Sequence, residues 1–372
     1  MRNPKTAGKA RKIMKLIGIA ILALCILTIV ITGALRIVNA NKSKIRTDNG
    51  IQENTYVELG GIEQYLQIRG EDKDNPVILW IHGGPGFPLT YLSYYYQTGL
   101  EDEYTIVCWE QRGCGRTYYE NKPAEDVSVE MLLSDMDELI DYLRARFGQE
   151  KIILLGQSWG TVLGIEYVNL HPEKVAAYIG VGQVTNFAKG KIYAGECAAE
   201  KAMREGNTAD AELLRQYIQQ FQKADSLENM DIKTLESLIT KSVEYLKSGS
   251  ELSGMTQMLT GITSPEMSLE DARWFMFAGS TGNIIESQKK LMDYMYFKFD
   301  IYKDKQEYDL PVCFIQGSHD WITPTDFVKD YYEKITDADK AFVIIENAGH
   351  TPFLDNPDEF CKAVKHFGST WK

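Results

Sequence analysis

Cysteine is scarce in this chain of 372 residues, and its distribution excludes several classes of protein. The six cysteines form no CxxC pair and show no spacing typical of a zinc site. Cys25, Cys108 and Cys313 lie in apolar segments, where a free thiol behaves as a small apolar side chain, and the remaining three are an odd number. The sequence therefore predicts neither a disulfide framework nor a metal site.

Acidic residues are absent from the first 46 positions, which contain ten Lys and Arg residues. Removing those ten from the 40 basic residues of the chain leaves 30 basic against 52 acidic residues, so residues 47–372 carry a formal charge of −22. A body this acidic repels nucleic acid, so we expect no nucleic-acid partner.

Charge of either sign is absent from residues 16–35, which as a helix would span about 30 Å, the thickness of a bilayer core. Six basic residues precede this stretch and four follow it, which predicts a cytoplasmic N-terminus and an extracellular body. We expect a basic tail over residues 1–15, a transmembrane signal-anchor over 16–38 and a polar linker over 39–53, in a single-pass protein of the cell membrane. The alternative is secretion after cleavage near Ala40, because residues 38–40 fit a signal-peptidase pattern.

Strand-like segments are absent from residues 186–305, where only helical patterns occur, near residues 193–205, 208–223, 232–247, 268–278 and 283–297. On either side, short apolar segments alternate with helical patterns, and a β-hairpin is expected around Gly60 and Gly61. Such alternation predicts an α/β fold with a mostly parallel sheet and helices on both faces. We assign residues 54–185 and 306–372 to this core and 186–305 to an inserted all-helical cap over the C-terminal edge of the sheet.

One motif organises the core. Residues 156–160 (GQSWG) follow an apolar strand and precede a helical pattern, with Ser158 between two glycines. This is the G-x-S-x-G nucleophile elbow, in which a sharp turn lifts the serine oxygen clear of the sheet. Small flanking residues are needed because the strand and the helix nearly touch. Ser158 is therefore predicted to be a catalytic nucleophile.

Two sources of oxyanion donors are present. The backbone N–H of Trp159, next to the nucleophile, is one. The other is the glycine loop at residues 82–86 (HGGPG), which directly follows an apolar strand; proline has no N–H, so Gly83 or Gly84 must donate.

A serine nucleophile also needs a base, and only five histidines are available. His171 and His366 lie within or at the end of helices, His82 belongs to the glycine loop and His319 precedes a better acid, which leaves His350. In the elbow fold the acid comes between serine and histidine along the chain, and Asp320, just after the strand at 312–316, fits that order. Glu346 is the reserve candidate for the acid. The predicted triad is Ser158, Asp320 and His350, which requires no cofactor.

These motifs, with residues 109–116 (WEQRGCGR), 317–320 (GSHD) and 348–350 (AGH), resemble in kind and order the prolyl (proline) iminopeptidase family of α/β-hydrolases. The resemblance covers roughly residues 55–370 and is weakest in the cap. It implies a serine hydrolase, an aminopeptidase that removes an N-terminal residue, preferably proline, from short peptides. In that family acidic side chains of the cap hold the substrate ammonium. Glu110, Cys114 and Thr117 depart from the usual DQRGSGRS pattern, and a membrane anchor is not typical of the family.

Candidates for substrate binding are Glu196 and Glu200, four residues apart on one predicted helix face, and Tyr95 in the aromatic run after the glycine loop. A solvated acidic face and ordinary packing are the simpler interpretations of these features. Because fold and triad do not determine the substrate, an anchored carboxylesterase or lipase-like hydrolase acting on a small acyl substrate is the leading alternative. A non-enzymatic hydrolase-fold binder is a third hypothesis, disfavoured by the complete catalytic set.

Overall fold

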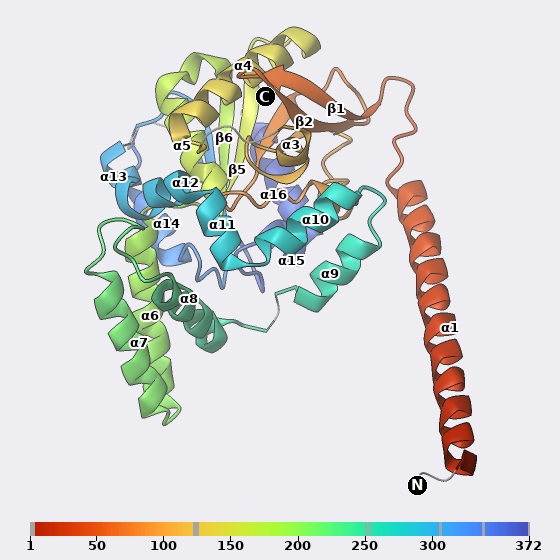
Figure 1. Cartoon of the computed structure of the whole chain (residues 1–372). Coiled ribbons are helices and arrows are strands. Elements are labelled where there is room, and N and C mark those ends of the chain that lie inside the picture. The colour runs from red at the N-terminus through yellow and green to blue at the C-terminus, as the bar shows by residue number, and fades with distance from the viewer. Residues whose placement is uncertain are drawn as a thin grey trace.

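The computed structural model describes residues 4–121, 126–249, 251–252, 254–304, 307–336 and 339–370. It consists of a central sheet with helices on both faces, a group of helices gathered at one end of the sheet, and one long N-terminal helix beside them (Figure 1).

The sheet has eight strands in the order β1-β2-β4-β3-β5-β6-β7-β8. The strands β3 to β8 pair in parallel, whereas β2 pairs antiparallel with β1 and with β4. Leu59 pairs with Ile62 across the turn at Gly60 and Gly61, which confirms the predicted hairpin. The strands are β1 (Ile51–Leu59), β2 (Ile62–Gly70), β3 (Val77–Ile81), β4 (Thr105–Trp109), β5 (Ile152–Gln157), β6 (Val175–Val181), β7 (Val312–Gly317) and β8 (Lys340–Ile345).

Alternate residues of the central strands enter two different cores. Leu79 of β3 and Leu154 of β5 belong to the apolar cluster on one face, whereas Trp80 and Leu155 belong to the cluster on the other. Since side chains alternate across a strand, a strand buried on both faces is apolar throughout. This explains the continuous apolar runs in the sequence and confirms the doubly covered sheet.

The first face is covered by α4 (Val129–Phe147), α5 (Trp159–Leu170) and α14 (Thr325–Lys334), the second by α2 (Ser93–Tyr96), α15 (Pro352–Asp355) and α16 (Pro357–Thr370). The helix α4 begins where its sequence predicts, because the Ser128 hydroxyl accepts the N–H of Met131, and it ends at Gly148 in the left-handed conformation. Shorter helical turns are η1 (Thr90–Leu92), α3 (Gly115–Glu120) and η2 (Pro172–Lys174).

Between β6 and β7 the described residues form helices and no strand. Ser268 and Asp271 form the predicted capping box at the start of α10. The helix α9 was not predicted from the sequence. These helices are α6 (Phe187–Arg204), α7 (Thr208–Phe221), α8 (Ile232–Leu246), α9 (Gly254–Ile262), α10 (Leu269–Ala278), α11 (Thr281–Ser287), α12 (Lys289–Asp293), the π-helical turn η3 (Tyr294–Lys298) and α13 (Ile301–Asp304).

The N-terminal helix α1 (Pro4–Lys42) is continuous. Its segment Lys12–Lys42 has a mean hydropathy of 2.8 in its most apolar window, none of it buried, which is long and apolar enough to cross a membrane. Of the residues 39–53 expected as a linker, 39–42 continue α1 and 51–53 begin β1, so residues 43–50 connect the two elements.

Candidate active site

Ser158 lies at the turn between β5 and α5, at the C-terminal edge of the sheet. Its backbone φ is 51°, a conformation that a residue with a side chain rarely adopts. The Ser158 N–H donates to the carbonyl of Val181 at 2.9 Å, and its own carbonyl accepts the Thr161 hydroxyl at 2.6 Å. Strand and helix therefore hold a strained serine in place, as a nucleophile elbow requires.

The two flanking glycines are required by contact with backbone. A Cβ on Gly156 would lie 2.5 Å from the carbonyl oxygen of Gly160. A Cβ on Gly160 would lie 2.1 Å from the carbonyl oxygen of Ile81, at the end of β3. Any side chain at either position would therefore displace the turn that carries Ser158.

Asp320 and His350 are brought together from the loops after β7 and β8. The His350 Nδ1 lies 2.9 Å from Oδ2 and 3.1 Å from Oδ1 of Asp320. The buried carboxylate also accepts the Thr323 hydroxyl at 2.7 Å and the backbone N–H groups of Ile322 and Thr323 at 2.9 Å. Burial alone would raise the pKa of Asp320, but the charge of His350 and these hydrogen bonds outweigh it and lower the pKa.

The imidazole of His350 packs on the segment that holds Ser158. A Cβ on Gly182 would lie 3.0 Å from its Cε1 and 3.1 Å from its Nδ1. Val181, next to Gly182, accepts the N–H of Ser158. Because Asp320 binds Nδ1, Nε2 is the nitrogen that can take a proton from a hydroxyl.

The glycine loop approaches the elbow closely. A Cβ on Gly83 would lie 2.2 Å from Oε1 of Gln157, the residue before Ser158, and Gly84 has a φ of 121°. Trp159 occupies the first position of α5, where a backbone N–H has no acceptor within its own helix. The predicted oxyanion donors Gly83, Gly84 and Trp159 therefore come from segments that meet at Ser158.

His82 has a structural role in this loop. Its Nε2 accepts the N–H of Gln111 at 3.3 Å, so its Nδ1 carries the proton and donates to the carbonyl of Gly83 at 2.8 Å. Burial lowers the pKa of His82 to about 4, and the ring is therefore neutral at neutral pH. Gln111 also accepts the indole N–H of Trp159 at 3.2 Å, which links the glycine loop to the elbow.

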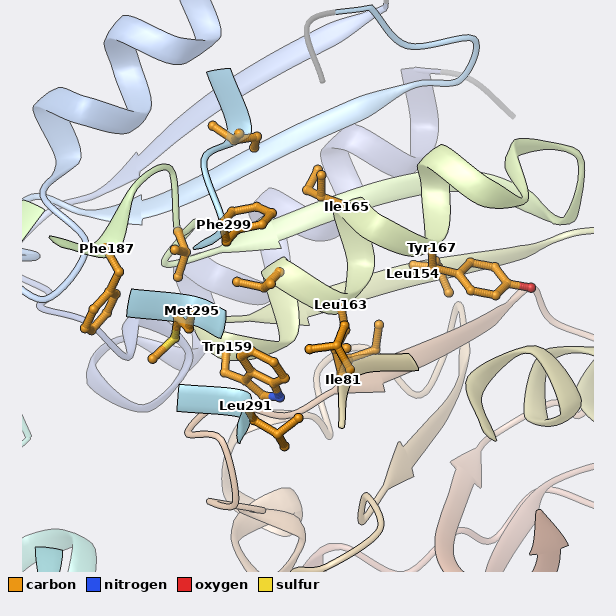
Figure 2. Packing of buried hydrophobic residues seen from close by; sticks show 14 of the residues in the cluster. Ile81, Leu154, Trp159, Leu163, Ile165, Tyr167, Phe187, Leu291, Met295 and Phe299 are labelled. Carbon is orange, nitrogen blue, oxygen red and sulfur yellow. The ribbon is translucent and has the colours of Figure 1, made fainter. Parts of the chain in front are cut away.

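The inserted helices pack directly on the elbow helix. Leu291 and Met295 of the insertion lie beside Trp159 within one cluster of buried side chains (Figure 2). The indole N–H of Trp274 donates to Gly86 of the glycine loop at 2.8 Å, and the Arg116 guanidinium forms an ion pair with Asp271. The glycine loop and the elbow are therefore in contact with the inserted helices as well as with the sheet.

A cleft of about 490 Å³ opens beside His350. The side chain of Trp321 contributes a buried indole N–H for which no described residue supplies an acceptor. The carboxylate of Glu251 accepts the N–H groups of Ser248 and Gly249 at 3.1 and 3.0 Å, and it packs against Gly349. The cleft is lined by Val243, Lys247, Gly249, Glu251, Leu252, Gly254, His319, Trp321, Ile322, Gly349 and His350.

The candidate substrate-binding residues lie elsewhere. Glu196 and Glu200 are exposed on α6, and neither lines the cleft. Tyr95 is half-buried and packs on the second apolar cluster. The acidic residue that the structure does bring to the cleft is Glu251.

Sequence reasoning missed Glu251, Thr323 and Lys191. The buried Lys191 of α6 donates from Nζ to the carbonyl of Ile322 at 2.9 Å, beside the loop of Asp320, and burial lowers its pKa to about 7. No motif marks these three residues, because their roles depend on contacts between the insertion and the loops after β7 and β8.

Comparison with known families agrees with this geometry. Residues 76–357 match the family described as "alpha/beta hydrolase fold". The chain belongs to the α/β-hydrolase family. Its turn from strand β5 into helix α5 at Ser158, and the order of Ser158, Asp320 and His350 along the chain, are those of this fold.

Curated relatives indicate which group of α/β-hydrolases this chain resembles. It is 28% identical over 312 residues to "Probable aminopeptidase YbaC" of Bacillus subtilis, which covers 82% of this chain and 93% of that protein. It is 32% identical over 120 residues to "Proline iminopeptidase" of Lactobacillus helveticus, covering 32% of this chain and 40% of that protein. These relatives confirm the resemblance to the proline iminopeptidase family.

Among solved structures, this α/β-hydrolase is similar to one described as "a membrane phospholipase A, a novel bacterial virulence factor". The TM-score is 0.59 at 16% sequence identity, covering 97% of this chain and 99% of the other. At this identity the similarity shows a shared fold.

Proposed function

We propose that this α/β-hydrolase is a serine aminopeptidase that releases one N-terminal residue, preferably proline, from short peptides through an acyl-enzyme. The observation that carries the proposal is the hydrogen-bonded pair of Asp320 and His350 beside a strained Ser158. The nearly full-length similarity to a relative named as a probable aminopeptidase supports the choice of substrate.

In the proposed reaction, the Ser158 oxygen attacks the carbonyl carbon of the first residue while Nε2 of His350 takes the hydroxyl proton. The N–H of Trp159 and that of Gly83 or Gly84 would stabilise the resulting oxyanion. His350 then passes the proton to the leaving nitrogen, and the shortened peptide departs. Water, deprotonated by the same imidazole, breaks the acyl ester and regenerates the serine.

An aminopeptidase must also bind a free ammonium group, and Glu251 supplies a carboxylate in the cleft beside His350. Burial alone would raise the pKa of Glu251, but hydrogen bonds from backbone N–H groups, including those of Ser248 and Gly249, outweigh it and lower the pKa. The group is therefore ionised at neutral pH. We assign Glu251 the role of holding the substrate ammonium, although Lys247 also lines the cleft.

The second candidate function is a membrane-anchored esterase or lipase-like hydrolase that uses the same triad. The apolar helix α1 favours it, and a solved structure of similar fold, which covers 97% of this chain, is described as a membrane phospholipase A. Both functions share the same acyl-enzyme chemistry and differ in what occupies the cleft.

A comparison of substrates separates the two functions. The full-length protein is assayed with proline nitroanilide and with a short-chain nitrophenyl ester. We expect turnover of the anilide and its loss, together with fluorophosphonate labelling, in Ser158→Ala. Ester turnover without anilide turnover would contradict the peptidase, and an unlabelled wild-type Ser158 would contradict both hydrolases.

We further propose that α1 anchors the protein in the cell membrane, with a cytoplasmic N-terminus and the catalytic body outside. The uncharged residues 16–35 and the basic residues before them support this topology. The full-length polypeptide should fractionate with membranes and retain its original N-terminus. A mature N-terminus near residue 41 in the soluble fraction would establish the secreted alternative instead.

A further inference from the structure

Helix α9 of the insertion has its apolar side facing outward. Its exposed side chains include Met255, Met258, Leu259 and Ile262, a spacing that places them on one helical face. Leu269, Phe275 and Met276 of α10 are also exposed, to 69%, 54% and 76%. We call these seven residues the apolar rim.

The inward side of α9 is made of small and polar residues. Gly261 is buried against the ring of Tyr91, and the carbonyl of Thr260 accepts the Tyr94 hydroxyl at 2.9 Å. Just beyond the helix, the buried Ser264 hydroxyl donates to the carbonyl of Tyr91. A helix on a water-exposed surface normally has the opposite arrangement, with its apolar side toward the core. The aromatic run after the glycine loop thus holds α9 in an inverted orientation.

Charge is almost absent from α9 and from the segment that joins it to α10, whereas α10 itself contains Glu270, Asp271 and the exposed Arg273. Residues 254–268 contain a single charged residue, Glu266. Its carboxylate is directed toward the body, where it accepts hydrogen bonds from Asn54 and Gln67 at 3.2 Å and lies 3.7 Å from the Arg69 guanidinium. The outward side of α9 therefore has no charged group to interact with water.

The apolar rim lies where α1 meets the body. Arg36 donates to the carbonyl of Met267 at 2.7 Å, and Asn39 donates to that of Thr263 at 2.9 Å. Both acceptors lie in the segment joining α9 to α10, on the side of the body that faces α1 (Figure 1). Arg36 is also the first charged residue after the uncharged stretch 16–35, so the end of α9 lies at the level where α1 would leave the bilayer.

Contact with α1 does not account for the apolar rim, because its residues are exposed with α1 in place. We propose that the rim docks into the headgroup and upper acyl region of the membrane that α1 crosses, as a second membrane contact. The inference rests on the proposed anchoring by α1. Interfacial helices bury an apolar face at this depth, and Met, Leu, Ile and Phe side chains suit it.

Docking would also orient the site. Glu251, Leu252 and Gly254 line the cleft beside His350, and Gly254 is the first residue of α9. The mouth of the cleft would then lie at the membrane surface, so that substrates concentrated there reach it directly.

Spin labels test the proposal in the full-length protein, reconstituted in nanodiscs of phosphatidylethanolamine and phosphatidylglycerol. Cysteines introduced by Met258→Cys or Met276→Cys, in a Cys25→Ser/Cys197→Ser background, are labelled with a nitroxide. Leu170→Cys is the matched control, because Leu170 is an exposed apolar residue at the far end of α5 from Ser158. Fluorophosphonate labelling checks that each variant is folded.

At positions 258 and 276 we expect the ratio of collisions with oxygen to collisions with a water-soluble nickel chelate to be several-fold higher than at 170. A ratio equal to that at 170 overturns docking, and shielding from both reagents overturns it in favour of a second copy of the chain. A label on native Cys25, in a separate Cys197→Ser protein without an introduced cysteine, reports on α1. A lipid-exposed label at Cys25 together with water-exposed labels on the rim would contradict docking but support anchoring by α1. Water-exposed labels at both places would contradict docking and anchoring alike.

Discussion

At the residue scale, three carboxylates around the cleft have different environments and therefore different uses. Asp320 is buried and fully hydrogen-bonded, which suits a group that holds an imidazole. Asp355 accepts the N–H groups of Gly349 and Leu252 at 2.9 and 2.7 Å, so it joins the histidine loop to the insertion. Glu251 lies in the lining of the cleft itself and is the one placed to meet a ligand.

Glu251→Gln should weaken the binding of a cationic substrate specifically. The amide oxygen can accept one of the two backbone N–H groups, of Ser248 or Gly249, but the charge is removed. We therefore expect KM for proline nitroanilide to rise about tenfold, which corresponds to about 1.4 kcal/mol, with little change in kcat. KM for a neutral nitrophenyl ester should not change. Glu196→Gln and Glu200→Gln are matched controls on an exposed face. A larger rise in KM in either control would show that the substrate ammonium binds to α6 and not to Glu251.

Asp320→Asn should reduce kcat by about 10⁴-fold, because the amide no longer holds the reactive tautomer of His350 or stabilises the imidazolium. Asp326→Asn is the control: Asp326 follows closely in the chain but accepts the Tyr193 hydroxyl at 3.0 Å, away from His350. Steady-state kinetics on either substrate measures both. Equal effects of the two substitutions would contradict the assignment of the acid.

His82 should make folding stability depend on pH. Its pKa is about 4 in the folded protein and about 6.5 when unfolded. Between these values only the unfolded chain binds the proton, so stability falls as the pH drops from 6.5 toward 4, by up to about 1.4 kcal/mol per pH unit. The thermal unfolding midpoint of the wild type should therefore fall more steeply over this range than that of His82→Gln. Parallel curves would show that His82 is protonated in the folded state.

At the element scale, the nucleophile elbow depends on backbone contacts that leave no room for a side chain. Gly160→Ala places a Cβ against the end of β3, and we expect several kcal/mol of destabilisation and loss of fluorophosphonate labelling. Gly282→Ala is the matched control, because a Cβ there meets only the Ser280 hydroxyl at 3.9 Å and lies in a helix. Its thermal stability should be unchanged or slightly higher. A stable, labelled Gly160→Ala protein would contradict this account of the turn.

Helix α9 is also an element whose outward apolar face could not be predicted from the sequence. Residues 254–262 are short for a helix, and their apolar side chains face away from the body. Periodicity reports which side chains share a face, but it does not report whether that face meets a core, water or lipid. Tyr91 and Tyr94, in the aromatic run after the glycine loop, hold this helix.

At the scale of the whole molecule, buried polar contacts couple the insertion to the core. The guanidinium of Arg116, in the core, binds Asp271 of α10 and the hydroxyl of Tyr65, and all three side chains are buried. Removing one partner from such a pair leaves an uncompensated charge, which is more costly than removing both.

We therefore expect Arg116→Gln to lower the free energy of unfolding by about 3–5 kcal/mol. Adding Asp271→Asn should recover part of that loss rather than add to it, with a coupling energy of about 1–3 kcal/mol in a double-mutant cycle. Thermal or chemical unfolding of the four proteins measures the cycle. Simple additivity of the two losses would show that the ion pair does not couple the insertion to the core.

The sequence alone determined the fold class, the elbow at Ser158 and the pairing of Asp320 with His350. These features depend on local rules: apolar runs form buried strands, glycine is required where backbones touch, and loops after parallel strands meet at one edge of the sheet. Such rules act over a few residues or follow from chain order, so a single sequence displays them.

Only the tertiary structure decided which insertion residues reach the cleft. Glu196 and Glu200 have the right chemistry but lie on an exposed face of α6, whereas Glu251 lies beside His350, about 100 positions away in the chain. The packing of one element on another sets such positions, and helical periodicity carries no information about it. The same reason explains why the support of Asp320 by Thr323, the proximity of Lys191 and the outward apolar face of α9 became visible only in three dimensions.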